Sequence, residues 1–398
     1  MNALRLCRSL SFYRVGRLAP CRFASTLPGY PTPGTAFSPP PAPSRATEDA
    51  PSTASQGKKS TANIPKDSAL KTGLPESDIP IFTSLDELQS WRNKAFVQGK
   101  SVGFVPTMGA LHEGHIALVR ESLKENDLTV VSIYVNPAQF APHEDLSTYP
   151  RTLESDMRLL AATKLRAPLA VFLPTTAELY PSGISHAEQL GTYVVPAPSL
   201  ASQMEGKSRP TFFRGVATVV TKLLNAVLPS RVYFGQKDIQ QALIMRGMVR
   251  DLCMSARVRI VKTVREHAGD GVDLLALSSR NAYLTPGERV VAPTLRRALG
   301  AVEAAWYAGA GRSAALASGR GVVDEAIRQA PGVEMRLDYM EMNDPKTFQV
   351  ISDTLRSGAL NGAQGNKGPT VILSGALWVG RTRLIDNILL GDAEWVFE

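Results

Sequence analysis

Short apolar runs alternate with longer stretches of helical periodicity from about residue 79 onward. Five runs rich in Val, Ile, Leu and Ala predict buried strands at 102–105, 129–135, 170–173, 231–234 and 258–264. Apolar residues recur every three or four positions in the segments that predict helices, at about 84–97, 116–124, 153–163, 215–227 and 239–252. Strands that alternate with helices in this way form βαβ units, so the pattern predicts an α/β fold with a parallel sheet.

The pattern changes after about residue 264. Two predicted helices and three short predicted strands follow, at about 286–308, 313–330, 335–342, 370–373 and 383–390. Residues 353–368 are rich in Gly, Asn and Ser and predict an inserted surface loop. We therefore expect a first domain over 79–264 and a smaller α+β domain over 265–398.

The first 78 residues differ in composition from the rest of the chain. Residues 1–26 carry five arginines and no acidic residue, which is typical of a mitochondrial presequence. The alternative is a disordered tail without a targeting role, on a cytoplasmic protein. Residues 27–78 hold ten prolines among many Ser, Thr and Gly, and they predict a disordered linker.

Charge and cysteine content narrow the function classes. Ten Lys or Arg and three acidic residues within residues 1–75 give +7 of the chain's net charge of +8. The remainder is therefore nearly neutral, which argues against nucleic-acid binding by the folded part. Of the three cysteines only Cys253 lies beyond the tail, which excludes a disulfide framework there. No apolar run reaches the length of a membrane span, so no membrane partner is expected.

The most informative motif follows the apolar run at 102–105. A turn with Gly109 and Gly114 leads from this strand into a helix, and glycine lets backbone approach a ligand where a Cβ would clash. A helix start offers unpaired N–H groups and a positive dipole end that suit phosphate. His112 and His115 are three residues apart, so both imidazoles can reach one phosphate group. The alternatives are a surface pair or a metal site, although a zinc-protease helix needs histidines four apart.

Polar residues also follow two other predicted strands, at 136–140 and 235–238. Parallel sheets bind ligands outside the carboxyl ends of their strands, so these segments are expected to meet the histidine turn. Lys237 supplies a point charge for phosphates, Asp238 can accept hydrogen bonds from a ribose, and Gln241 can face the same pocket. The alternative is an ordinary glycine turn with a solvated Lys–Asp pair.

A polar loop at 277–281 lies between the two predicted domains. Ser278, Ser279 and Arg280 offer two hydroxyls and a guanidinium, which together can clamp a phosphate. The alternative for this loop is a turn with an asparagine cap. For Gln139, at a strand end, the amide can bind a hydroxyl or carboxylate, and the alternative is a polar turn residue.

Six segments together resemble the pantoate–β-alanine ligase family in order and spacing: 106–115, 135–140, 149–152, 213–218, 235–241 and 278–281. The histidine motif alone would point only to the wider nucleotidyltransferase (HIGH) superfamily. The resemblance implies a Rossmann-like doubly wound parallel sheet with a smaller α+β C-terminal domain, and a homodimer. It also implies that ATP and (R)-pantoate give pantoyl adenylate and pyrophosphate, and that β-alanine then releases AMP and pantothenate.

The resemblance also implies roles for individual residues. ATP would be contacted by Met108, Gly109, Ala110, Leu111, His112, Glu113, Gly114, His115, Gly235, Gln236, Lys237, Asp238, Val264, Leu277, Ser278, Ser279 and Arg280. Pantoate would be held by Pro106, Gln139 and Gln241, and β-alanine by Gln139. The catalytic groups would be His112, His115, Lys237 and Arg280, with His115 conventionally the proton donor. Mg²⁺ would bridge the phosphates, with Asp156 as a protein partner.

Two departures from the family pattern and two competing functions remain. Gln236 stands where a glutamate is usual, and the segment 267–275 is longer than usual. The first alternative is another nucleotidyltransferase, similar to pantetheine-phosphate adenylyltransferase, which would lack Gln139, Gln241 and the Ser-Ser-Arg loop. The second is a catalytically idle partner or RNA-binding protein, which predicts a damaged histidine pair or a lost Lys237, and the sequence has neither.

Overall fold

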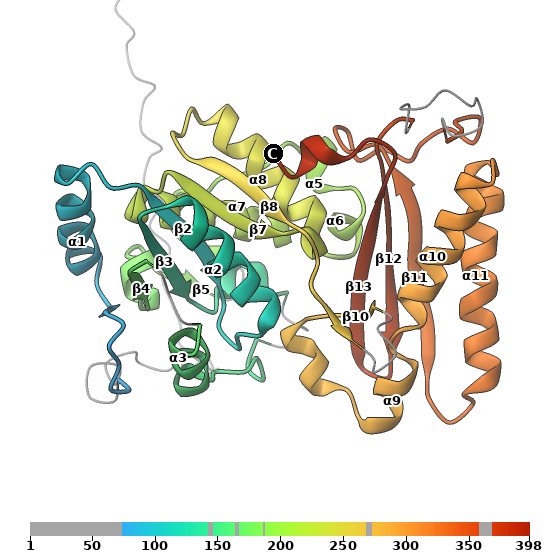
Figure 1. Cartoon of the computed structure of the whole chain (residues 1–398), viewed down its shortest axis with the longest axis horizontal. Helices are drawn as coiled ribbons and strands as arrows, with labels where there is room; N and C mark the ends of the chain where they lie inside the picture. The colour runs from blue at the N-terminus through green and yellow to red at the C-terminus, as the bar shows by residue number, and fades with distance from the viewer. Residues whose placement is uncertain (1–73, 142–145, 164–166, 186–187, 268–272, 358–367) are drawn as a thin grey trace, which may run out of the picture. The chain divides into compact units, whose positions relative to one another are not determined.

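The computed structural model describes residues 74–141, 146–163, 167–185, 188–267, 273–357 and 368–398 (Figure 1). The segment predicted as a presequence, most of the predicted linker and most of the loop expected at 353–368 lie outside these residues. No helix within the described ranges has the length and apolar character to cross a membrane.

The first part of the described chain, up to residue 264, contains a sheet of six parallel strands in the order β1-β4-β3-β2-β7-β8. The second part is the rest of the chain, from residue 265. They are β1 Ile81–Phe82, β2 Val102–Thr107, β3 Leu128–Ile133, β4 Leu169–Phe172, β7 Arg231–Gly235 and β8 Arg257–Val261. The chain runs outward from β2 to β3 and β4 and then returns to β7 on the other side of β2. This reversal creates the crevice in which doubly wound sheets bind ligands. The α/β prediction is confirmed.

Helices cover both faces of this sheet (Figure 1). The helices and 3₁₀ turns of this part are α1 Leu85–Val97, α2 Glu113–Glu125, η2 Pro137–Gln139, α3 Leu153–Ala161, α4 Thr176–Leu179, α5 Pro198–Ala201, α6 Glu205–Ser208, α7 Phe212–Val227, η3 Gln236–Asp238 and α8 Ile239–Asp251. Side chains of α1, α7 and α8 share a core with Phe104 of β2, while those of α2 and α3 pack with Val105 on the opposite face. Because both faces are buried, the strands read as continuous apolar runs. A short hairpin, β5 Ile184–Ser185 and β6 Glu188–Gln189, lies between α4 and α5.

A second core joins helices to a three-stranded antiparallel sheet of order β11-β12-β13. Its elements are the hairpin β9 Arg265–His267 and β10 Asp273–Ala276, η4 Ser279–Tyr283, the helices α9 Pro286–Val291, α10 Thr294–Tyr307 and α11 Arg312–Gln329, and the strands β11 Met335–Asn343, β12 Val371–Val379 and β13 Thr382–Leu390. Helix α10 packs on β12 and β13, and α11 packs on β11, as Figure 1 shows. A last turn, η6, covers Glu394–Val396.

Several element boundaries differ from the sequence prediction; for example, β8 ends at Val261 and not at 264. Three further differences involve a proline or a glycine. The helix expected over 286–308 is two helices, because Pro293 lacks an N–H and its ring interrupts the ladder. The strand expected to end at 373 continues to Val379, with Gly375 inside it, where a Cβ would lie 3.1 Å from Leu295 of α10. Helix α7 begins at Phe212, before the predicted start at Gly215, so that glycine lies inside the helix.

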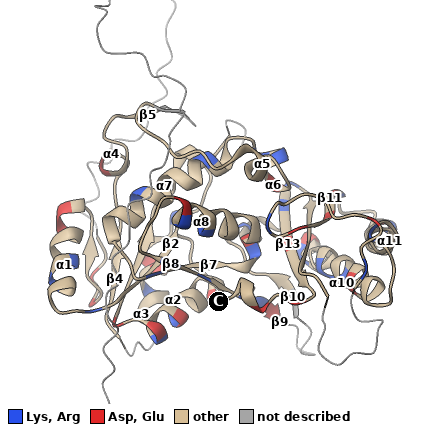
Figure 2. Ribbon diagram, turned by 90° about the horizontal axis from the view of Figure 1, so that it is seen from above, with Lys and Arg blue, Asp and Glu red and all other residues tan. Residues whose placement is uncertain are grey.

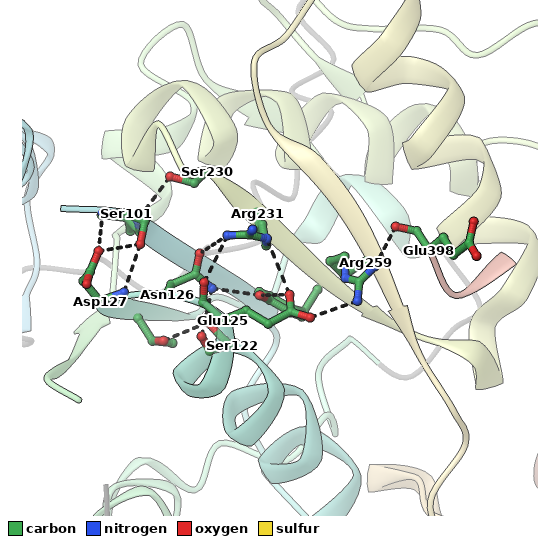
Figure 3. Close-up of polar contacts among 12 residues, drawn as sticks. Ser101, Ser122, Glu125, Asn126, Asp127, Ser230, Arg231, Arg259 and Glu398 are labelled. Carbon is green, nitrogen blue, oxygen red and sulfur yellow. Dashed lines mark hydrogen bonds and ion pairs between the residues drawn. The ribbon is translucent and has the colours of Figure 1, made fainter. Parts of the chain in front are cut away.

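Charged residues of both signs are mixed along the helices of the first part, and α1 and α2 each carry acidic and basic side chains (Figure 2). A polar network closes the amino ends of β7 and β8 (Figure 3). Arg259 donates to Glu125 at 2.9 Å and to the backbone carbonyl of Glu398 at 2.7 Å, and Tyr233 donates to Glu125 at 2.8 Å. This network joins α2, β8 and the last described residue, and it lies at the opposite end of the strands from the segments singled out as candidate site.

Candidate active site

A cavity of about 770 Å³ opens at the carboxyl ends of β2 and β7. The sequence-predicted residues that line it are Pro106, Met108, His112, Gly114, His115, Gln139, Gly235, Lys237, Asp238, Gln241, Val264, Leu277, Ser278, Ser279 and Arg280. Segments more than 170 residues apart in the chain therefore meet around one space. The remaining predicted residues, Gly109, Ala110, Leu111, Glu113, Gln236 and Asp156, do not line it.

The histidine pair is held by hydrogen bonds within its own turn. His112 caps α2, and its Nδ1 accepts from the N–H of Gly114 at 3.1 Å. The Nδ1 of His115 accepts from the N–H of His112 at 3.4 Å, and the two ring centroids are 4.1 Å apart. Because both Nδ1 atoms are acceptors, a neutral ring at either position carries its proton on Nε2. Both residues line the cavity, and in each neutral ring Nε2 is the nitrogen that can donate a hydrogen bond.

Both imidazoles are neutral near pH 7. Burial lowers the pKa of His112 to about 4, with a further lowering by the Lys237 ammonium and a partial offset by Asp238. Burial also lowers the pKa of His115 well below its ordinary value, and His112 and Lys237 act in the same direction. In this environment each histidine is a neutral ring that can donate one hydrogen bond, from Nε2.

The turn before these histidines depends on Asp156 of α3. This buried carboxylate accepts from the N–H groups of Ala110 at 3.0 Å and Leu111 at 2.8 Å, and from the hydroxyl of Thr152 at 3.1 Å. Burial raises the pKa of Asp156 and these hydrogen bonds oppose the rise. Ala110 has a φ of 49°, a left-handed conformation that is strained for a residue with a Cβ. The carboxylate therefore fixes the shape of the turn.

The same hydrogen bonds bear on two predicted roles. The N–H groups of Ala110 and Leu111 already have an acceptor in Asp156, so their contact with ATP stays a prediction. Oδ2 of Asp156 accepts from Ala110 and Oδ1 accepts from Leu111 and Thr152, so the role of this carboxylate as a metal partner also stays a prediction. Within the described ranges no group of three or more His, Cys, Asp or Glu could hold a metal ion. For Glu113, the carboxylate is paired with Arg120 at 2.8 Å on the exposed side of α2.

Gln139 is positioned by neighbours that the sequence analysis did not single out. Its Oε1 accepts from Nδ2 of the buried Asn136 at 3.0 Å, and Asn136 in turn accepts from the Tyr180 hydroxyl at 2.6 Å. The backbone carbonyl of Gln139 accepts from Arg209 at 3.1 Å. Since Asn136 occupies the side-chain oxygen Oε1, the Gln139 side-chain amide has its N–H groups left for a ligand that accepts hydrogen bonds. An asparagine directly before a Pro-Ala-Gln turn is the sequence signal for this arrangement.

The second part of the chain contributes more to the cavity wall than the loop at 277–281, which is the only segment of this part that the sequence predicted there. Arg383 of β13 lines the cavity, donates to Glu205 at 2.6 Å and 3.0 Å, and donates to Asp338 at 2.9 Å. Burial lowers the pKa of Arg383, but the two carboxylates more than compensate and raise it. Two pairs of polar residues, 382–383 and 386–387, interrupt an otherwise apolar strand, and they are the sequence signal for this contribution to the cavity.

Comparisons with known proteins show which family the chain is similar to. The family model described as pantoate-beta-alanine ligase matches residues 80–389. The chain is similar to the pantoate–β-alanine ligase of Saccharomyces cerevisiae, with 40% identity over 78% of this chain and 99% of the relative. It is equally similar to the pantothenate synthetase of Herpetosiphon aurantiacus, with 40% identity and the same coverage.

Solved structures show the same likeness in three dimensions. The pantothenate synthetase of Thermus thermophilus superposes with a TM-score of 0.64 at 40% identity, over 78% of this chain and 99% of that one. The Francisella tularensis enzyme, solved with β,γ-ATP and β-alanine, superposes with a TM-score of 0.59 at 29% identity, over 78% and 97%. The matched residues span both the six-stranded sheet and the antiparallel one that together enclose the cavity, and on this ground the chain belongs to the pantoate–β-alanine ligase family.

Proposed function

We propose that the enzyme joins (R)-pantoate to β-alanine in two steps, through a pantoyl adenylate, with release of pyrophosphate and then AMP. The observation that carries this proposal is one cavity that is lined by two groups of side chains with different chemistry. His112, His115, Lys237 and Arg280 suit a polyphosphate, and the amides of Gln139 and Gln241 suit a small hydroxy acid.

The first step needs positioning and charge neutralisation more than a base. The pantoate carboxylate is already ionised, so it can attack the α-phosphate of ATP directly once the two are aligned. Lys237 and Arg280 supply positive charge for the leaving pyrophosphate. The two Nε2–H donors stabilise the phosphate oxygens as charge grows on them. Because burial keeps the pKa of His115 low, we assign it as a donor of hydrogen bonds instead of a proton donor.

Mg²⁺ is part of this proposal, and the donor set limits how it would be held. Asp238 is a partly exposed carboxylate in the cavity wall, and no described cluster supplies a protein cage. Mg²⁺ commonly binds through substrate phosphates, waters and one or two carboxylates, which this site can accommodate. There it would neutralise phosphate charge.

The second step exchanges the adenylate oxygen for nitrogen. The amine of β-alanine attacks the acyl carbon, the carbon–oxygen bond to AMP breaks, and the amide nitrogen loses a proton to solvent. Gln139 is proposed to orient both substrates, because Asn136 fixes its carbonyl oxygen and leaves its N–H groups for a carboxylate or hydroxyl.

Isotope exchange and product release test the two steps separately. With ATP, Mg²⁺ and pantoate but no β-alanine, the purified full chain is expected to exchange labelled pyrophosphate into ATP. Addition of β-alanine is expected to release AMP. Exchange that requires β-alanine would refute a free adenylate step, and AMP release that is indifferent to the acid or the amine would refute the substrates. An enzyme similar to pantetheine-phosphate adenylyltransferase would instead use pantetheine phosphate, and no observation in this cavity favours that substrate.

Two further expectations concern assembly and location. The family resemblance leads us to propose a homodimer, and light scattering on the purified protein is expected to give twice the chain mass of 42.9 kDa. The arginine-rich start leads us to propose mitochondrial import, tested with a reporter fused to residues 1–30. Diffuse fluorescence would refute import and favour the cytoplasmic alternative.

A further inference from the structure

The turn that carries Lys237 is held by a side chain from the second sheet. Asn387 of β13 is buried, and its Nδ2 donates to the backbone carbonyls of Gln236 at 2.8 Å and Lys237 at 2.9 Å. Its Oδ1 accepts from the side-chain amide of Gln236 at 3.2 Å. Three hydrogen bonds thus link one asparagine to two successive residues about 150 positions earlier in the chain.

Asn387 is itself fixed by a buried ion pair. Its backbone N–H donates to Asp386 at 2.8 Å, and the Asp386 carboxylate accepts both Nη atoms of Arg265 at 2.5 and 2.8 Å. The Arg265 and Asp386 side chains are only 9% and 5% exposed. Arg265 directly follows Val264, which lines the cavity. Bidentate pairs of this kind have little geometric freedom, so Asn387 is a rigid point from which to hold the turn.

Gln236 completes the arrangement. Its Oε1 accepts from the N–H of Thr263 at 3.4 Å while its Nε2 donates to Asn387. A glutamate at this position could still accept from Thr263 but would bring a carboxylate against Oδ1 of Asn387. Rotating the Asn387 side-chain amide by about 180° would relieve that repulsion, but it would point Oδ1 at the backbone carbonyl oxygens of Gln236 and Lys237. The glutamine therefore fits the amide direction in which Asn387 donates to both carbonyls.

We propose that Asn387 is a positioning residue that sets the direction of the Lys237 side chain by holding both peptide units of its turn. Among the described residues, the ion-pair partner of Lys237 is its neighbour Asp238 at 3.4 Å, a weak contact, so the position of the backbone limits where the flexible side chain can place its ammonium. This inference rests on the proposed function, in which Lys237 neutralises the leaving pyrophosphate. A displacement of about 1 Å at a positioned group can lower a rate by about 10².

A double-mutant cycle tests whether Asn387 acts through Lys237. Asn387→Ala is expected to lower kcat by about 10 to 100-fold while the KM for pantoate changes by less than about two-fold. In a Lys237→Ala background the same substitution is expected to change kcat by less than about two-fold, because coupled residues give non-additive effects. If Asn387→Ala does not fold, Asn387→Asp takes its place in the cycle. This substitution keeps the side-chain volume and removes the N–H donors, so the same loss of kcat is expected.

Asn343 provides the matched control. It is a fully buried asparagine of β11 that donates to the carbonyl of Phe348 at 2.9 Å and does not line the cavity. Asn343→Ala is expected to lower thermal stability, with kcat within about two-fold of wild type in both backgrounds. Losses for Asn387 and Lys237 that multiply, or an Asn387→Ala enzyme with wild-type kcat, would overturn the coupling alone. A wild-type enzyme that does not turn over pantoate would overturn the proposed function and the coupling together.

Discussion

Gly215 of α7 lies against the 3₁₀ turn η2, and its replacement by alanine gives a sharp test of the pantoate site. A Cβ at this position would lie 2.2 Å from the carbonyl oxygen of Ala138, 2.5 Å from its carbonyl carbon and 2.8 Å from the N of Gln139. Ordinary contacts begin at 3.4 Å, so the methyl group comes about 1.2 Å too close to the oxygen. The obstructing atoms belong to the backbone, so no side-chain rotation can relieve the clash.

The turn must therefore move, and Gln139 moves with it. Asn136 donates both to Oε1 of Gln139 and to the carbonyl of Gly215, at 3.0 and 3.3 Å, so the shift also disturbs the residue that orients this amide. We expect Gly215→Ala to lower kcat/KM for pantoate by about 10 to 100-fold, since misplacement by about 1 Å costs about 10² in rate. Overpacking should also lower the free energy of unfolding by about 1–3 kcal/mol.

Initial rates of AMP release at varied pantoate and varied ATP, with thermal unfolding, measure these effects. The KM for ATP should change by less than about two-fold, because the proposed phosphate ligands lie on other turns. Gly247→Ala in α8 is the control, since no atom lies within 4 Å of its Cβ position, and it should stabilise the protein by about 0.5–1 kcal/mol. Wild-type kcat/KM for pantoate in Gly215→Ala would refute the reasoning, as would a KM for ATP that rises by about ten-fold or more.

Three further predictions concern ionisable side chains. Burial lowers the pKa of His112 to about 4, so below about pH 6.5 the unfolded chain binds more protons than the folded one, and the free energy of unfolding should fall as pH falls towards 4. Denaturant titrations of His112→Asn should show a weaker dependence of this free energy on pH. An unchanged pH dependence would contradict the prediction. Asp156→Asn should lose about 1–3 kcal/mol in thermal unfolding and lower kcat at every Mg²⁺ concentration, whereas rescue by added Mg²⁺ would indicate a metal role. Arg265→Met leaves the Asp386 carboxylate buried without its partner and should lower the unfolding free energy by about 3–5 kcal/mol in urea, and a loss below about 1 kcal/mol would show that the pair is solvated.

The sequence by itself determined which segments become strands and helices and which strand ends carry chemistry. Apolar periodicity reports the burial of each face, and the continuous apolar runs of β2 and β3 required a sheet covered on both sides. The histidine turn was readable for the same reason, because glycine spacing and a helix start are local properties. The parallel topology then brings the carboxyl ends of β2 and β7 to one edge of the sheet.

Only the tertiary structure decided what those side chains meet. The neutral state of His112 depends on burial by distant elements and on Lys237, which is 125 positions later. Asp156 holds the turn at Ala110, and Gly215 is a packing contact instead of a helix start. Asn387 reaches the Lys237 turn across about 150 residues. Hydrogen bonds act over about 3 Å, so their partners follow from strand order and register, which local composition does not encode.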